Sequence, residues 1–237
     1  MPRFDEPTYT VPPETFFDGL PPLDDPGPLP ELREPDEGEI TDPSDEPLVR
    51  VEHRRIRVLA NYWHAGWSTA VPATWLRRGV MERLGAVADA LPDAWGLAVF
   101  DGWRPLALQR ELYEVATADP HIEPGLMAPP STDPTTPPPH LTGGAVDLTL
   151  TWEGTPLAAG TGFDDITSRA YVDALENEPG PSRLLRRALF HRMADQGFVV
   201  YRGEWWHFEW GTRRWAGVRG AQPIYGPATP TASPTGA

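Results

Sequence analysis

The sequence predicts an α+β domain in which helices pack on a small, mainly antiparallel β-sheet. Three observations predict this fold class. Apolar residues recur at helical spacing in the first half of the domain, strict alternation marks a strand at 145–151, and a hairpin pattern covers 198–210. Helices therefore come early and strands gather late, which is typical of α+β domains rather than of alternating βαβ units.

Charge and proline divide the 237-residue chain into three parts. Residues 1–48 hold 14 acidic residues, 12 prolines and two arginines, so they carry −12 of the net charge of −14. Like charge and proline oppose a packed core, and we expect most of this arm to be disordered, although its aromatic residues would also let it wrap across the domain. Residues 49–220 form the predicted domain, whose length of about 170 residues can bury one core. We expect residues 221–237, which contain four prolines, to form a flexible tail.

Composition excludes several classes of function. An acidic arm and a balanced domain argue against nucleic acid binding, which requires a basic face. Because the chain has no cysteine, any transition metal must be held by His and carboxylate side chains. No segment approaches the ~18 apolar residues of a membrane span, and residues 1–6 lack the pattern of an export signal. We therefore expect a cytoplasmic protein with no membrane partner; its oligomeric state is not indicated.

The first elements of the domain follow from periodicity and proline. Apolar residues at steps of three and four predict a helix over 76–91, which Pro92 ends. The apolar run 95–100 predicts a buried strand. Pro105 favours the first turn of a second helix, whose apolar face continues to Val115.

The second half of the domain begins after a Pro-rich loop. Residues 145–151 alternate as a strand does, with even-numbered apolar residues on one face and Asp147 on the other. A third helix is predicted over 181–197, opened by a proline and ended by Gly197 as a left-handed cap. Residues 198–201 and 205–210, on either side of a turn, predict a β-hairpin.

The segment from His140 to Asp147 is the first candidate site. A carboxylate on a half-buried strand needs a partner, because an unpaired buried charge is costly. A metal ion supplies one, and the separation of seven residues lets the loop, which leads through two glycines into the strand, bring His140 back beside Asp147. The alternative is a turn His and a strand Asp that pairs with an Arg.

The second candidate site is the motif Glu204-Trp-Trp-His207. Residues three apart in an ideal strand point to opposite faces, so Glu204 must lie in the turn, or a bulge must intervene, if both residues share a site. His140, Asp147 and His207 then offer three ligands, and Glu204 offers an unligated carboxylate. Three ligands, an open position for water and a nearby base are typical of a catalytic zinc site.

The third candidate is the motif Asp101-Gly-Trp-Arg-Pro105, which lies where a strand ends and a helix begins. An arginine at such a position can stabilise developing oxyanion charge or bind a carboxylate. The alternative is that Asp101 and Arg104 form a pair that only closes the turn.

In this order and spacing the three motifs resemble those of the zinc D-alanyl-D-alanine dipeptidases, cytoplasmic enzymes related to the vancomycin-resistance dipeptidase. The resemblance covers residues 54–210. It implies the fold of D-Ala-D-Ala metallopeptidases and hedgehog-like domains, with the zinc site on the sheet. It also implies that His140, Asp147 and His207 bind one Zn²⁺ per chain, that Glu204 is the general base and that Arg104 steadies the tetrahedral intermediate.

The resemblance further implies a small dipeptide substrate, D-Ala-D-Ala or a related D-amino-acid dipeptide. The stretch 160–164 is similar to the family's Gly-Ser-x-Phe-Asp, which implies that Asp164 holds the substrate ammonium. We expect Asp101 and Trp206 to contribute to substrate binding because they belong to the motifs, and His64 is a further candidate for the pocket. The chain departs from the family before the first ligand. Two prolines stand where a serine is often found, so the exact dipeptide and its stereochemistry stay open.

Two other functions compete with this interpretation. A D,D- or L,D-carboxypeptidase that trims peptidoglycan stem peptides would share the His and Glu motifs, but such enzymes less often have Asp-Gly-Trp-Arg-Pro and usually carry an export signal. A non-catalytic, zinc-stabilised binding domain would need neither Glu204 nor Arg104.

Overall fold

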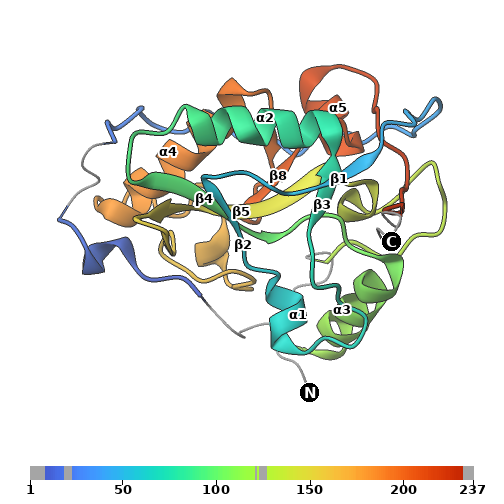
Figure 1. Cartoon of the computed structure of the whole chain (residues 1–237), viewed down its shortest axis with the longest axis horizontal. Coiled ribbons are helices and arrows are strands. Elements are labelled where there is room, and N and C mark those ends of the chain that lie inside the picture. The colour runs from blue at the N-terminus through green and yellow to red at the C-terminus, as the bar shows by residue number, and fades with distance from the viewer. Residues whose placement is uncertain (1–8, 19–22, 121, 123–126, 232–237) are drawn as a thin grey trace, which may run out of the picture.

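The computed structural model describes residues 9–18, 23–120, 122 and 127–231 (Figure 1). The outermost parts of the predicted arm and tail, 1–8 and 232–237, lie outside the described residues. The strands are β1 (Leu48–Arg50), β2 (Ile56–Val58), β3 (Trp75–Arg77), β4 (Trp95–Asp101), β5 (Ala145–Trp152), β6 (Thr155–Pro156), β7 (Val199–Val200) and β8 (His207–Glu209). The helices are α1 (Asn61–Ala65), α2 (Arg78–Asp89), α3 (Leu106–Ala118), α4 (Pro181–Asp195) and α5 (Arg213–Arg219).

The described strands form a main sheet and a small one. The main sheet has the order β2-β4-β5-β8-β7, with β6 paired to β5, and β1 pairs with β3 in the second sheet. Every pair is antiparallel except β2 with β4. The prediction of an α+β fold with a mainly antiparallel sheet is therefore confirmed.

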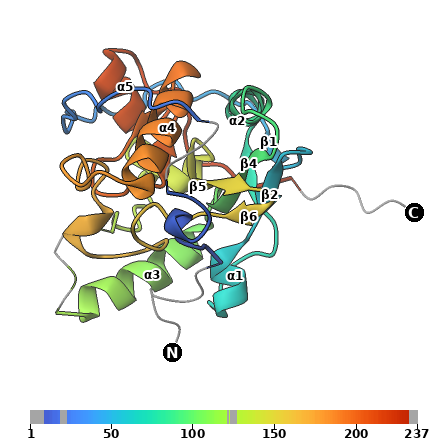
Figure 2. The ribbon, with the colours of Figure 1, turned by 90° about the vertical axis from the view of Figure 1, so that its left-hand side faces the viewer.

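Helices cover both faces of the main sheet. Helices α2, α4 and α5 lie on one side, and α1 and α3 lie on the other (Figures 1 and 2). As a result the two central strands, β4 and β5, are buried over nearly their whole length, including the polar face of β5 that carries Asp147. Within the described residues, no helix combines the length and the apolar character that crossing a membrane requires.

Several boundaries differ from the expected ones for local reasons. Helix α2 begins at Arg78 and not at residue 76, because Leu76 pairs with Val49 in the small sheet. Gly197 follows α4 with φ +83°, the left-handed cap that the sequence predicts. The second strand of the hairpin is β8 alone, since residues 201–206 form the turn.

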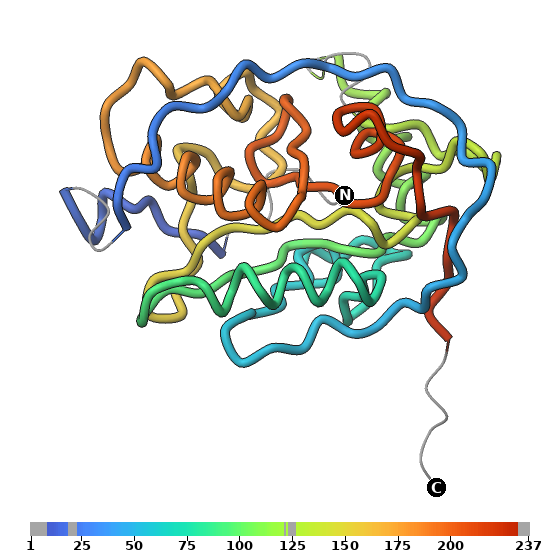
Figure 3. The backbone as a smooth tube through the Cα atoms, turned by 90° about the horizontal axis from the view of Figure 1, so that it is seen from above, coloured from blue at the N-terminus to red at the C-terminus, as the bar shows by residue number. Residues whose placement is uncertain are grey.

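The described parts of the arm and tail contact the domain. Phe17 packs on Trp95 and Trp152, with ring centroids 6.1 and 5.5 Å apart, and Ile40 is 3% exposed. From Leu23 onward the arm runs along one side of the molecule past α4 and α5 (Figure 3). In the tail, Tyr225 is 1% exposed. The division at 48/49 and 220/221 into arm, domain and tail stays a prediction.

Candidate active site

Strand register places three predicted site residues in one row across the sheet. Asp147 of β5 is paired directly with Asp101 of β4 on one side and with His207 of β8 on the other. Directly paired residues in antiparallel strands point to the same face. This row lies on the face flanked by α1 and α3, because Arg104, which is near Asp147, also contacts Tyr62 of α1 and Gln109 of α3.

His140 reaches this row from the turn that precedes β5. The turn is a 3₁₀ helix, Pro139–Thr142, and Gly143 ends it with φ +73°, a conformation that favours glycine. Gly144 follows in a tight space, where a Cβ atom would lie 2.8 Å from the carbonyl oxygen of Trp210. The two glycines of the motif therefore let the chain reverse direction and enter β5 with His140 beside Asp147.

Two ring nitrogens and a carboxylate converge at the centre of the site. His140 Nε2 lies 3.2 Å from His207 Nδ1 and 3.3 Å from Asp147 Oδ2, while His207 Nδ1 lies 3.0 Å from Asp147 Oδ1. One ligand atom from each residue falls within 4.8 Å of the others, so the group could hold a metal ion.

The ring nitrogens of His140 and His207 that point away from the ligand group each have a hydrogen-bond partner. His140 Nδ1 lies 2.7 Å from the carbonyl oxygen of Gly102, and His207 Nε2 lies 3.0 Å from Glu209 Oε1. Both partners accept hydrogen bonds, so each outward nitrogen donates, and when the rings are neutral, as metal ligands must be, the inward nitrogens present lone pairs to each other and to Asp147. A cation between them removes this conflict. Two imidazoles held by outer acceptors, with one carboxylate and no thiolate, fit zinc.

The charges in the cluster favour a cation as well. Burial by itself would lower the pKa of His207, but hydrogen bonds to Asp147 and Glu209 raise that pKa to about 10. Burial by itself would raise the pKa of Asp147, but the neighbouring His140 and His207 lower it. The site therefore attracts positive charge strongly even though it is buried.

Glu204 lies in the turn before β8, and this position lets it share a site with His207 although the two residues are three apart. Its backbone N–H donates to the carbonyl oxygen of Tyr201, and its own carbonyl accepts from the N–H of His207. The Glu204 carboxylate lies 3.8 Å from His207 Nδ1, outside the ligand group. Burial, followed by repulsion from Asp147, raises the pKa of Glu204 to about 6, although His207 opposes this shift.

Arg104 is buried, and each of its three guanidinium nitrogens faces a polar partner. Its Nε donates to Asp101 at 2.8 Å, its NH1 donates to Gln109 at 2.9 Å, and its NH2 lies 3.6 Å from Asp147 Oδ2. The pair that closes the turn at 101–104 is thus formed, and the same arginine also faces the ligand group. Asp101 lies behind Arg104 and His140 and is not among the described residues that line the cavity.

Asp164 enters the site from the loop after β6. Its φ of +59° is uncommon for a non-glycine residue, and the ring of the preceding Phe163 stacks on Phe100 at 4.6 Å. Tyr62 donates a hydrogen bond of 3.3 Å to Asp164 and accepts one from Arg104. Burial, together with repulsion from Glu204, raises the pKa of Asp164 well above its ordinary value.

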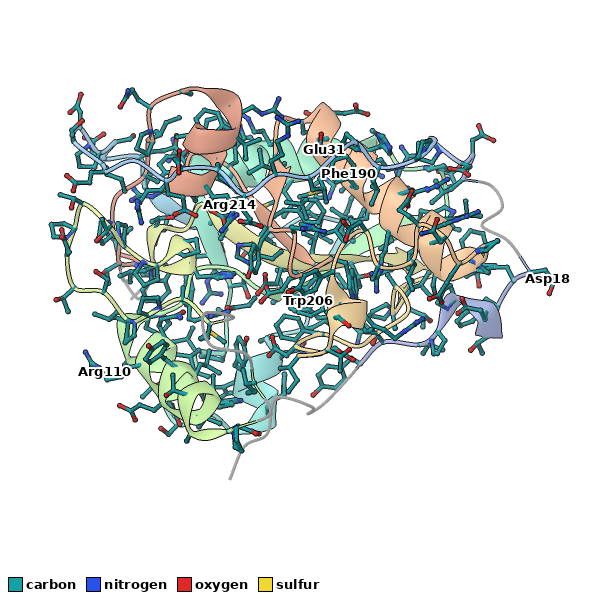
Figure 4. All side chains as sticks on the ribbon, turned by 180° about the vertical axis from the view of Figure 1, so that it is seen from behind. Asp18, Glu31, Arg110, Phe190, Trp206 and Arg214 are labelled. Carbon is teal, nitrogen blue, oxygen red and sulfur yellow. The ribbon has the colours of Figure 1, made fainter. Side chains whose placement is uncertain are left out.

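These groups surround a cavity of about 290 Å³. The cavity is lined, among others, by His140, Asp147, His207, Arg104, Glu204 and Asp164. Trp206, labelled near the middle of the view in Figure 4, is 1% exposed and borders a neighbouring space of about 20 Å³ together with Asp164 and Glu204. The predicted ligands, base, arginine and ammonium partner therefore meet at one cavity, whereas Asp101 and Trp206 lie behind its wall.

Three polar residues of the site are not among the candidates that the sequence offers. In the aromatic segment 61–67 the sequence candidate is His64, but that residue is exposed, and Tyr62 lines the cavity instead. Gln109 holds Arg104 from α3. Glu209 was detectable, because residues two apart in a strand share a face and Glu209 follows His207 by two.

The fold and the site define a metallopeptidase, and comparisons with known proteins agree. Residues 80–218 match the model of peptidase family M15, described as D-ala-D-ala dipeptidase. The chain is also similar to a D-alanyl-D-alanine dipeptidase of Synechocystis sp., with 32% identity over 175 residues, which is 60% of this chain and 71% of the relative. This chain belongs to the D-Ala-D-Ala dipeptidase family of metallopeptidases.

Proposed function

We propose that this chain is a zinc-dependent dipeptidase that binds one zinc ion and hydrolyses a free D-amino-acid dipeptide, with D-Ala-D-Ala as the first candidate. The observation that carries the proposal is the meeting of a His-Asp-His group, a buried acid, a buried arginine and a second acid at one cavity. The curated relative, which is named for this activity, supports the choice of substrate.

His140, Asp147 and His207 would hold the zinc ion. When bound there, zinc supplies a Lewis acid for activating water and polarising the scissile carbonyl. The protein side chains around it then have separate tasks. Glu204 accepts the proton of the attacking water and returns it to the departing amine, a role suited to a carboxylate whose pKa is raised to about 6.

Arg104 would stabilise the negative oxygen that develops on the substrate. Asp101 and Gln109 fix its guanidinium, so the charge is already oriented before the reaction begins. A preorganised donor of this kind costs no reorganisation in the transition state.

Asp164 would recognise the free amino group of the dipeptide. Burial and repulsion from the neighbouring Glu204 raise the pKa of Asp164, and a substrate ammonium beside the two acids relieves this repulsion. The cavity of about 290 Å³ is at the small end of ligand pockets, which suits a dipeptide better than a peptidoglycan stem peptide.

Blocking the amino group of a good dipeptide is expected to reduce cleavage strongly. N-acetyl-D-Ala-D-Ala has no ammonium to pair with Asp164, and leaving a buried polar group without its partner costs about 1–3 kcal/mol. We expect kcat/KM to fall by about 5- to 150-fold relative to D-Ala-D-Ala, the factor that corresponds to this cost. The variant Asp164→Asn should lower kcat/KM for the free dipeptide while zinc content, measured by elemental analysis, stays unchanged.

The matched control is Asp173→Asn, which removes an acid whose partner is the exposed Arg202 and should leave kcat/KM unaltered. A carboxypeptidase would behave in the opposite way, because it would accept an acylated or extended amino end. If N-acetyl-D-Ala-D-Ala or a pentapeptide stem were cleaved as fast as the free dipeptide, the carboxypeptidase function would replace the dipeptidase function.

A further inference from the structure

Glu209 is a buried carboxylate outside the predicted ligand group. Its side chain is 3% exposed, and Oε1 lies 3.0 Å from His207 Nε2, the ring nitrogen that points away from the metal position. The other oxygen, Oε2, accepts a hydrogen bond from the hydroxyl of Thr212. Glu209 thus contacts the ring of the predicted metal ligand His207 on the side away from the metal, and Thr212 fixes the Glu209 carboxylate.

Arg214 of α5 connects this carboxylate to the acidic arm. Its Nε lies 3.3 Å from Glu209 Oε1, its NH2 lies 3.1 Å from Glu37 Oε1, and its NH1 pairs with Glu34. The Arg214 side chain is 16% exposed, so these pairs are partly shielded from solvent. Figure 4 shows Arg214 where the ribbon of the arm, on which Glu31 is labelled, crosses this part of the molecule.

The backbone of the arm is also fixed against α5. Arg213 donates from Nε to the carbonyl oxygen of Gly38 at 2.7 Å and from NH2 to that of Glu37 at 2.9 Å. At Gly217 the approach is so close that a Cβ atom would lie 2.6 Å from the carbonyl oxygen of Asp36. The two arm acids therefore reach Arg214 from a backbone segment that is itself held.

We propose that Glu209 is a positioning residue for the metal ligand His207, and that the arm acids Glu34 and Glu37 hold Glu209 in place through Arg214. An imidazole that binds a metal through Nδ1 must carry its proton on Nε2, and a fixed carboxylate there sets both the tautomer and the ring orientation. The acidic arm thereby forms the outer layer of the metal site. This inference rests on the metal site of the proposed function.

The test measures zinc affinity rather than turnover. Zinc-loaded full-length protein is titrated with a chromogenic chelator to obtain the zinc Kd of each variant, and circular dichroism checks that each variant is folded. Glu209→Gln keeps the shape but removes the charge, and we expect its zinc Kd to rise by about 10–100-fold, as for other outer partners of metal ligands. The double variant Glu34→Gln/Glu37→Gln should raise Kd by about two- to fivefold, the range of half-exposed ion pairs.

The matched control is Asp25→Asn, because Asp25 is an arm acid that pairs with Arg187 of α4, apart from this chain of contacts. Its zinc Kd should equal that of the wild type. A wild-type Kd in Glu209→Gln would overturn the positioning role, and a double arm variant no different from Asp25→Asn would overturn the role of the arm. A wild-type protein that held no zinc would instead overturn the metal site itself. If Glu209→Gln is unfolded, Arg214→Gln replaces it, with an expected Kd above that of the double arm variant.

Discussion

Replacing Glu204 by Gln is expected to lower kcat by about 10²–10⁴-fold and to leave the metal in place. The amide has nearly the same shape as the carboxylate but cannot accept a proton from the attacking water. Glu204 Oε2 lies 3.8 Å from His207 Nδ1 and does not belong to the ligand group, so metal content should be unaffected. The measurements are kcat for D-Ala-D-Ala and the bound zinc by elemental analysis.

Glu178→Gln is a suitable control for this substitution, because Glu178 is an exposed acid paired with Arg169. The control should retain wild-type kcat and zinc. A Glu204→Gln protein with near wild-type kcat would remove Glu204 from the mechanism, and one that lost its zinc would make Glu204 a ligand.

Alanine at His140, Asp147 or His207 is expected to remove the zinc and with it the activity. Each substitution leaves two ligands, so the loss of zinc affinity should exceed the 10–100-fold typical of an outer partner such as Glu209. Asp147→Ala should be the most severe, because it also leaves Arg104, His140 and His207 close together without the carboxylate that all three face.

Zinc content by elemental analysis checks this prediction, and His64→Ala is the control because His64 is an exposed histidine on α1. The control should keep a full complement of zinc. Full zinc in a folded variant of any one of the three residues would show that this residue is not a ligand.

Elements with a strong pattern could be predicted from the sequence, whereas short or polar ones could not. β5 alternates over its whole length, and the predicted range 145–151 stops one residue before its observed end. β1 and β3 have three residues each, too few to show a period, and their pairing takes Leu76 out of the predicted helix. In α5 the single buried residue is Ala216, so no apolar stripe marks this helix.

The same distinction applies to the site. The spacing of the motifs predicts that His140 returns beside Asp147 and that Glu204 lies in the turn or beside a bulge. It could not predict the register that pairs Asp147 with both Asp101 and His207, because cross-strand neighbours are not encoded in local spacing. The sequence also does not show that Tyr62 lines the cavity, because only tertiary packing decides which residue of the aromatic helix α1 faces it.

The most direct test of a zinc dipeptidase is to remove and restore its metal. Full-length protein is stripped with a chelator, dialysed, and assayed for release of D-alanine from D-Ala-D-Ala before and after stepwise addition of zinc. We predict that stripping abolishes release and that activity returns linearly until about one zinc per chain has been added, as expected for a single site with three protein ligands. Release that continued at the original rate in the stripped protein would contradict a metal-dependent mechanism at His140, Asp147 and His207.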